Sequence, residues 1–203
     1  YFPITDSIDK ADMQVFTGLI KLSLGYQVHF DYSANSDANT LKSLTNLRYF
    51  SGEYEDFRTL AKLFANPEQI LGLYNMRLDS DEPDYSYSTE KKEEDPDAPF
   101  KAFSSLEELT LHIDDDYTKG LLFLRNFPKL KTLALELNAD KSPMDLSPLS
   151  SLSSLSSLDL LGTGDSSVEN VAVLSGMPQL EQLSLRNLKD VKDLNFVQNM
   201  PKL

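Results

Sequence analysis

The stretch from residue 145 to residue 163, DLSPLSSLSSLSSLDLLGT, decides the fold. Its leucines recur every three residues from Leu146 to Leu158, and the last step, to Leu160, is two residues. That two-residue step indicates the start of a strand, because alternate residues of a strand share one face. The same ending, leucine-x-x-leucine-x-leucine, begins at Leu106, Leu130, Leu155 and Leu180, so the period is 24 or 25 residues. Repeats of this length stack into a solenoid.

These repeats resemble the leucine-rich-repeat family, and residues 145–163 are most similar to the short repeats of bacterial internalin-type surface proteins. The resemblance covers nearly the whole chain and is strongest from Leu106 to Leu203. It implies an α/β fold with a curved parallel β-sheet on the concave face and helices or turns on the convex face. The family's turn asparagine is present only as Asn138, so a continuous asparagine ladder is not expected.

The chain is expected to form a single leucine-rich-repeat domain over residues 1–203, truncated at both ends, with about seven repeats. Prolines in the phrases NFPKL, GMPQL and NMPKL should end the convex-side helices, because the residue before a proline disfavours helical geometry. Strands are expected near Leu22, Phe50, Met76, Leu109, Leu133, Leu158 and Leu183.

One spacing breaks the period. The third and fourth repeats are separated by 33 residues, counted from Leu73 to Leu106. The surplus, residues 79–100, is acidic, contains proline and has almost no aliphatic residues. This composition predicts a solvated acidic insertion loop at the edge of the solenoid.

The bulk composition excludes several classes of partner. The net charge of −13 and the pI of about 4.5 would repel phosphate groups, so neither nucleic acid nor an anionic membrane surface is an expected partner. No apolar run approaches the roughly 20 residues that span a bilayer, so no membrane insertion is expected in this segment. The absence of cysteine excludes disulfide-bonded caps. With the family resemblance, it favours an extracellular or cell-surface bacterial protein, and a cytoplasmic location is the alternative.

Little in the sequence points to catalysis. The two histidines, His29 and His112, lack a context that indicates a catalytic base, so a non-enzymatic protein without a cofactor or a resident metal is expected. The acidic insertion and residues 114–116, three aspartates, could together bind Ca²⁺ weakly through their oxygens. Neither has the spacing of a calcium-binding loop, so solvated acidic loops are the favoured interpretation.

The outward residues of the concave sheet are the candidate site. Tyrosine and arginine are enriched in binding hot spots, which places Tyr26, Tyr49, Tyr74 and Arg77 first. The other partner-binding candidates are Glu53, His112, Glu136 and Arg186. The assumed register of the third strand puts Arg77 beside Thr110 and Asn75 beside Glu108.

By resemblance, the sequence predicts a non-catalytic protein–protein interaction module of a bacterial surface or secreted protein, which binds a protein ligand on its concave face. Two alternatives remain: an intracellular adaptor or substrate-recognition subunit, and the targeting domain of a larger secreted effector enzyme. If the assignment is right, charge reversal at Arg77 combined with Tyr49→Ala weakens partner capture without unfolding the chain.

Overall fold

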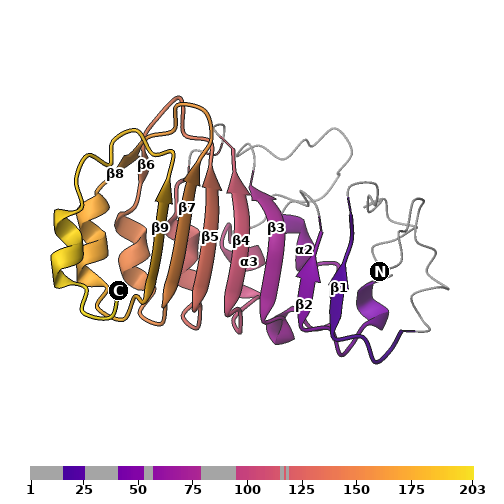
Figure 1. Cartoon of the computed structure of the whole chain (residues 1–203). Coiled ribbons are helices and arrows are strands. Elements are labelled where there is room, and N and C mark those ends of the chain that lie inside the picture. Colours follow the sequence, from indigo (N-terminus) through magenta and orange to yellow (C-terminus); the bar gives the residue numbers. More distant parts are fainter. Residues whose placement is uncertain (1–15, 26–40, 53–56, 79–94, 115–116, 118) are drawn as a thin grey trace.

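Parallel strands stack in chain order to form one seven-stranded sheet (Figure 1). The computed structural model describes residues 16–25, 41–52, 57–78, 95–114, 117 and 119–203. Within these residues, the strands lie close to the expected positions, which confirms the predicted solenoid. They are β1 (Lys21–Ser23), β2 (Tyr49–Ser51), β3 (Gly72–Leu78), β4 (Glu108–Ile113), β5 (Thr132–Leu137), β7 (Ser157–Gly162) and β9 (Gln182–Arg186).

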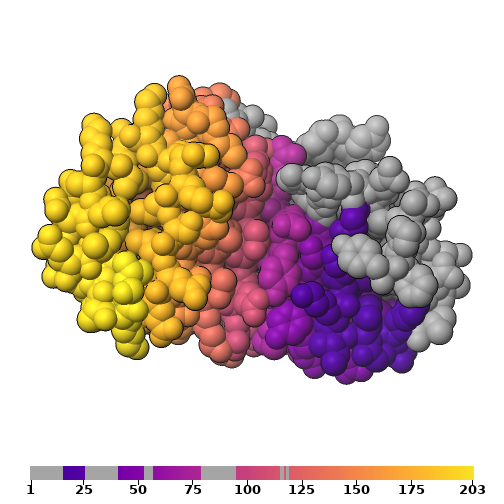
Figure 2. All heavy atoms as spheres, viewed as in Figure 1, coloured from indigo at the N-terminus to yellow at the C-terminus, as the bar shows by residue number. Residues whose placement is uncertain are grey.

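The leucine columns form the centre of the core. Leu109, Leu133 and Leu158 lie directly opposite one another on β4, β5 and β7, and each is at most 1% exposed. Buried and half-buried residues alternate along β4, as expected for a strand with one face in the core. A single repeat cannot bury its apolar face alone, so each repeat depends on its neighbours. Successive repeats form bands of colour along one elongated body (Figure 2).

Short helices cover the other side of the sheet (Figure 1). Three of the 3-10 helices end two residues before a proline, at Pro128, Pro178 and Pro201, as the repeated phrases predict. The described helices are η2 (Leu41–Ser43), α2 (Phe57–Leu60), η3 (Pro67–Gln69), α3 (Ala98–Lys101), η5 (Leu122–Asn126), η6 (Ser147–Ser151), η7 (Val171–Gly176) and η8 (Asn195–Asn199).

An aromatic cluster behind the sheet corrects the expected extent of the insertion. Residues 79–94 lie outside the described residues. The last part of the predicted loop, however, belongs to α3, where Phe100 is 4% exposed. The Phe100 ring stacks on Phe57 and Phe123, with ring centroids 5.4 and 4.9 Å apart. Pro99 and Phe100 are therefore buried in the core rather than in a solvated loop, because Phe100 fills space between neighbouring repeats.

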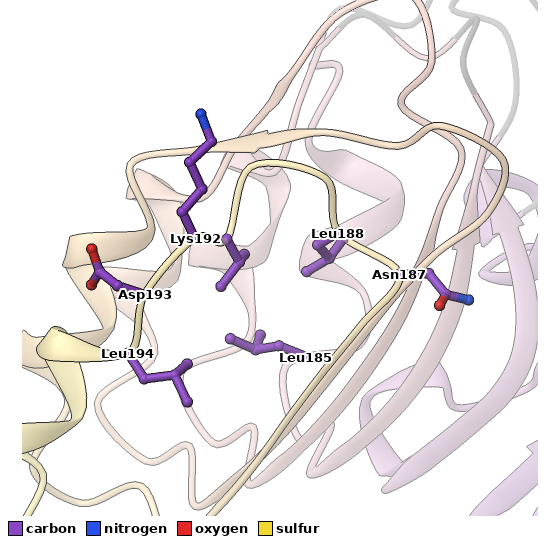
Figure 3. A pocket seen from close by; sticks show the side chains of 7 residues that line it. Leu185, Asn187, Leu188, Lys192, Asp193 and Leu194 are labelled. Atoms are coloured by element: carbon purple, nitrogen blue, oxygen red, sulfur yellow. The ribbon is translucent and has the colours of Figure 1, made fainter.

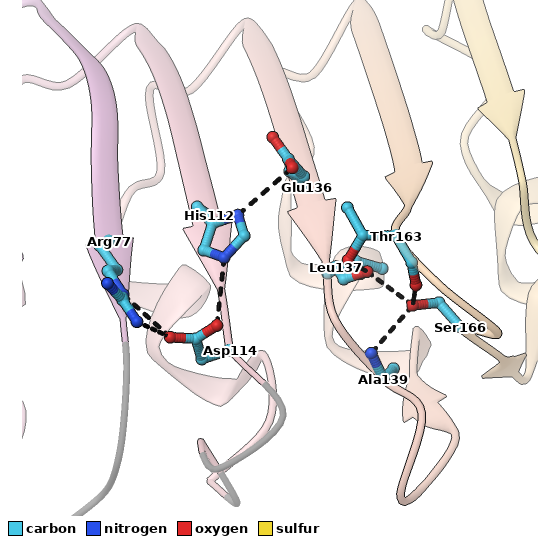
Figure 4. A network of polar contacts seen from close by, with 8 residues as sticks. All are labelled: Arg77, His112, Asp114, Glu136, Leu137, Ala139, Thr163 and Ser166. Atoms are coloured by element: carbon cyan, nitrogen blue, oxygen red, sulfur yellow. Dashed lines mark hydrogen bonds and ion pairs between the residues drawn. The ribbon is translucent and has the colours of Figure 1, made fainter. Parts of the chain in front are cut away.

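A second, two-stranded parallel sheet, β6 (Met144–Asp145) with β8 (Val168–Glu169), lies at the edge of two C-terminal repeats. Beside it, the Ser166 hydroxyl is fully buried. It accepts a hydrogen bond from the Ala139 amide at 3.0 Å and lies 2.7 Å from the Leu137 carbonyl oxygen (Figure 4). The Thr163 carbonyl is a further acceptor within its reach. One serine thus satisfies backbone groups of two neighbouring repeats, in a chain whose sequence has no continuous asparagine ladder.

Replacing Ser166 by alanine is expected to lower the free energy of unfolding by about 1–3 kcal/mol, because buried backbone groups lose their partner. Urea unfolding followed by circular dichroism measures the change. Ser150→Ala, at an exposed serine of η6, is the matched control and should have little effect. Equal effects of the two substitutions would contradict a structural role for Ser166.

Candidate functional site

A bulge in β3 sets the register of the concave face. Leu73 pairs with Leu109 and Met76 with Leu111, so two residues of β3 face one residue of β4. The extra residue is accommodated at Asn75, whose φ of 59° lies in the left-handed region that asparagine tolerates better than most residues.

This bulge corrects the row assigned to Arg77. The structure pairs Arg77 with His112 rather than with Thr110, and Gly72, not Asn75, lies opposite Glu108. The central position beside Ser51 is taken by Tyr74. Arg77 therefore belongs to the row that continues through His112 and Glu136.

Two of the predicted tyrosines meet over a glycine. A Cβ atom added at Gly72 would lie 2.7 Å from Tyr49 Cδ1 and 2.7 Å from the Tyr74 hydroxyl oxygen. The Tyr74 hydroxyl donates a hydrogen bond to Glu108 Oε2 at 2.5 Å. Desolvation of the phenol and its hydrogen bond to Glu108 raise the pKa of Tyr74 well above its usual range, so Tyr74 stays neutral. Lys21 of β1 places its Nζ 5.4 Å from the Tyr74 ring centroid. Tyr49, Gly72, Tyr74 and Glu108 are called the tyrosine–glutamate site below, and Lys21 lies over it.

Arg77 and His112 converge on Asp114 beyond the end of β4 (Figure 4). Arg77 Nε donates to Asp114 Oδ2 at 2.9 Å, and the second guanidinium contact goes to the same oxygen. His112 Nε2 lies 3.2 Å from Asp114 Oδ1, and Nδ1 lies 3.5 Å from Glu136 Oε1. Burial alone would raise the pKa of Asp114, but hydrogen bonds from Arg77 and with His112 hold that pKa below its usual range. The network joins three neighbouring strands.

The lowered pKa of Asp114 predicts a pH dependence. A carboxylate with a depressed pKa in the folded state stabilises the fold above its unfolded-state pKa of about 3.9, and this contribution is lost as the pH falls through the folded-state value. The difference in unfolding free energy between the wild type and Asp114→Asn should therefore be largest near neutral pH and shrink on acidification. Urea titrations at several pH values measure it, and a difference that grows as the pH falls would contradict this assignment.

The remaining predicted residues are only partly brought together. Arg186 Nη2 pairs with Asp159 Oδ2 at 2.7 Å on the C-terminal half of the concave face, away from the tyrosines. Glu136 joins the Asp114 network through His112. Tyr26 and Glu53 lie outside the described residues, so their placement stays a prediction.

Most of the expected weak calcium site, namely residues 79–94 and 115–116, lies outside the described residues. Within the described part, no three histidine, cysteine or acidic side chains group in a way that could hold a metal ion. Asp114, one of the proposed ligands, is instead engaged by Arg77. Of the helices in this part, none is long and apolar enough to cross a membrane.

The sequence assigns Glu108 and Asp159 to outward columns without naming them as binding candidates, and it does not indicate Gly72. Their partners are set by the register between repeats, which the sequence does not give directly. A signal was nevertheless present in the third repeat. Its inward residues, Ile70, Leu73, Met76 and Leu78, are spaced three, three and two apart, whereas those from Leu106 to Ile113 are spaced three, two and two apart.

A separate pocket of about 290 Å³ lies beside β9 (Figure 3). Its lining includes Leu185, Leu188 and Leu194, with Lys192 and Asp193 at the rim. The pocket is on the flank of the last described repeats rather than over the polar rows of the concave face. None of the predicted binding residues lines it.

The stacked parallel strands, inward leucines and backing of short helices define a leucine-rich-repeat solenoid. No protein-family model and no curated protein sequence matches the chain. Among solved structures, it is similar to an internalin (inlF) from Listeria monocytogenes, with 24% sequence identity and a TM-score of 0.57, over 96% of this chain and 49% of that one. It is also similar to internalin C2 (inlC2) from the same species, with 19% identity and a TM-score of 0.61, over 95% and 72% of the two chains.

A further likeness is to the TLR13–ssRNA13 complex, with 21% identity and a TM-score of 0.53, over 87% of this chain and 24% of that one. These likenesses confirm the leucine-rich-repeat fold and its resemblance to internalins. This chain spans about half the length of the inlF structure.

Proposed function

We propose that this chain is a non-catalytic interaction module that binds a protein ligand on its concave face. The observation that carries the proposal is the tyrosine–glutamate site, where two tyrosines meet over Gly72 on the sheet. Tyrosine combines a large apolar ring with a polar tip, which suits a protein interface. Small side chains at Thr132 and Ala134 continue the face beside it and leave room for a ligand.

A bacterial cell surface or the extracellular space is the proposed location, supported by the likeness to internalins and by the absence of cysteine. Subcellular fractionation of the source cells, with antibody detection, tests this part of the proposal. Recovery with cytoplasmic markers alone would overturn it. Single-stranded RNA is not the proposed ligand, although a protein of this fold occurs in the TLR13–ssRNA13 complex, because a net charge of −13 repels phosphate.

The binding face is tested by blocking it. Thr132 is exposed at the centre of the sheet, so Thr132→Trp should obstruct a ligand without touching the core. Ser150→Trp places the same side chain on η6, on the convex side, and is the matched control. Affinity capture and mass spectrometry first identify a partner. Calorimetry with the purified partner should then show that Thr132→Trp lowers the affinity about tenfold or more, whereas Ser150→Trp leaves it unchanged. A loss of affinity with Ser150→Trp alone would place the interface on the convex side and contradict the proposal.

The predicted hot spots need a modified variant, because Arg77 pairs with Asp114. Reversing the Arg77 charge would bring two carboxylates together, whereas Arg77→Gln keeps a hydrogen-bond donor. We expect Tyr49→Ala with Arg77→Gln to weaken partner binding about tenfold or more while the thermal midpoint stays within a few degrees. Unchanged affinity would remove these two residues from the interface.

A further inference from the structure

A cation already lies on the tyrosine–glutamate site. Lys21 Nζ is 5.4 Å from the centroid of the Tyr74 ring, within the roughly 6 Å range of a cation–π contact. Lys21 is exposed and comes from β1, two strands away from Tyr74. Because an exposed lysine side chain is flexible, another cation can replace it at small cost.

The hydrogen bond from Tyr74 to Glu108 strengthens this preference for positive charge. The phenol donates to a carboxylate oxygen at 2.5 Å, which increases the electron density of the ring and so the attraction of its face for a cation. A carboxylate offers about four acceptor positions, and Tyr74 takes one of them. Glu108 can therefore also accept a charge-assisted hydrogen bond from an ammonium or guanidinium group.

Gly72 and Tyr49 complete the shape of the site. Without a side chain at Gly72, both tyrosines can lie close to the sheet, since an added Cβ would meet each at 2.7 Å. Tyr49 of β2 and Glu108 of β4 lie opposite Gly72 on its two sides. The site therefore presents aromatic rings and a carboxylate next to one another.

The charges around the site also favour a cationic ligand. Arg77 and Arg186 are each paired with an aspartate, Asp114 and Asp159, so these cations are neutralised within the concave face. Glu108, in contrast, is hydrogen-bonded to a neutral phenol, which leaves its charge in place. The net charge of −13 would in addition steer a basic partner towards the chain.

We propose that the tyrosine–glutamate site binds a lysine or arginine side chain of the protein partner, and that Lys21 occupies the site in the free protein. This inference rests on the proposed function, since it names the chemistry of the ligand at the same face. On partner binding, the incoming cation displaces Lys21 from Tyr74 and forms a hydrogen bond to Glu108.

The test uses a fluorescein-labelled peptide of four glycine–arginine units and the full chain, with fluorescence anisotropy at 150 mM salt. We expect Glu108→Gln to weaken binding about tenfold and Lys21→Met to strengthen it severalfold, because the competing cation is gone. Gly72→Ala changes no charge but displaces both rings, so it should also weaken binding severalfold. Glu181→Gln removes one negative charge at an exposed residue outside the site and should leave affinity within twofold.

Equal losses for Glu108→Gln and Glu181→Gln would show general electrostatic attraction and overturn the inference, as would weaker binding of Lys21→Met. Thermal melts establish that each variant is folded, and Gly72→Ala provides a second result if Glu108→Gln is unstable. If Thr132→Trp abolishes partner binding while the site variants bind the peptide as the wild type does, the proposed function stands and this inference fails.

Discussion

Leu133→Ala is expected to lower the free energy of unfolding by about 2–5 kcal/mol. The Leu133 side chain is fully buried between Leu109 and Leu158 in the central column of the sheet. Truncation leaves a cavity that the flanking repeats cannot fill without moving together, because each is held by its own strand pairing. Urea unfolding monitored by circular dichroism measures the change.

Thr132→Ala is the control for this prediction, because Thr132 is the exposed neighbour on the same strand. Its effect should stay within about 0.5 kcal/mol, as is usual for surface substitutions. If both variants lose the same small amount, the leucine column does not carry the stability of the solenoid.

Phe100→Ala is expected to cost about 3–5 kcal/mol, the range for a buried phenylalanine. The sequence places this residue in a solvated loop, whereas the structure stacks it on Phe57 and Phe123. The experiment therefore separates the two assignments directly. Unfolding curves in urea provide the free energy.

Leu122→Ala is the matched control, since Leu122 lies next to Phe123 in sequence but is 58% exposed. It should change the unfolding free energy by no more than about 0.5 kcal/mol. An equally small effect of Phe100→Ala would show that Phe100 belongs to the solvated insertion loop rather than to the core.

The solenoid could be predicted because its signal is local and repeated. Leu133, Leu135, Leu158 and Leu160 specify a strand by their own spacing, and the next repeat shows the same spacing. The packing of Phe100 has no such signal. Its partners come from different repeats, and an acidic, proline-containing stretch precedes it, which suggests solvent exposure.

The candidate site was predicted in outline only. Strand alternation assigns Tyr49 and Arg77 to outward rows, whereas Tyr74 is selected only as a tyrosine of the same stretch; the structure pairs Tyr49 with Gly72, Tyr74 with Ser51 and Arg77 with His112. The grouping of Arg77 with Asp114 depends on the register after the β3 bulge. A shift of one residue changes the neighbours of each outward side chain, so pairs could not be assigned from composition or period alone.

The bulge at Asn75 also bears on how such a chain can evolve. Leu73 and Met76 both keep their partners on β4, so a change in repeat length is confined to the two residues between them. An insertion or deletion at this point would leave the stacking of later repeats intact. Individual repeats can thus diverge in length independently. New side chains can be added to the concave face of the sheet while the leucine columns stay in register.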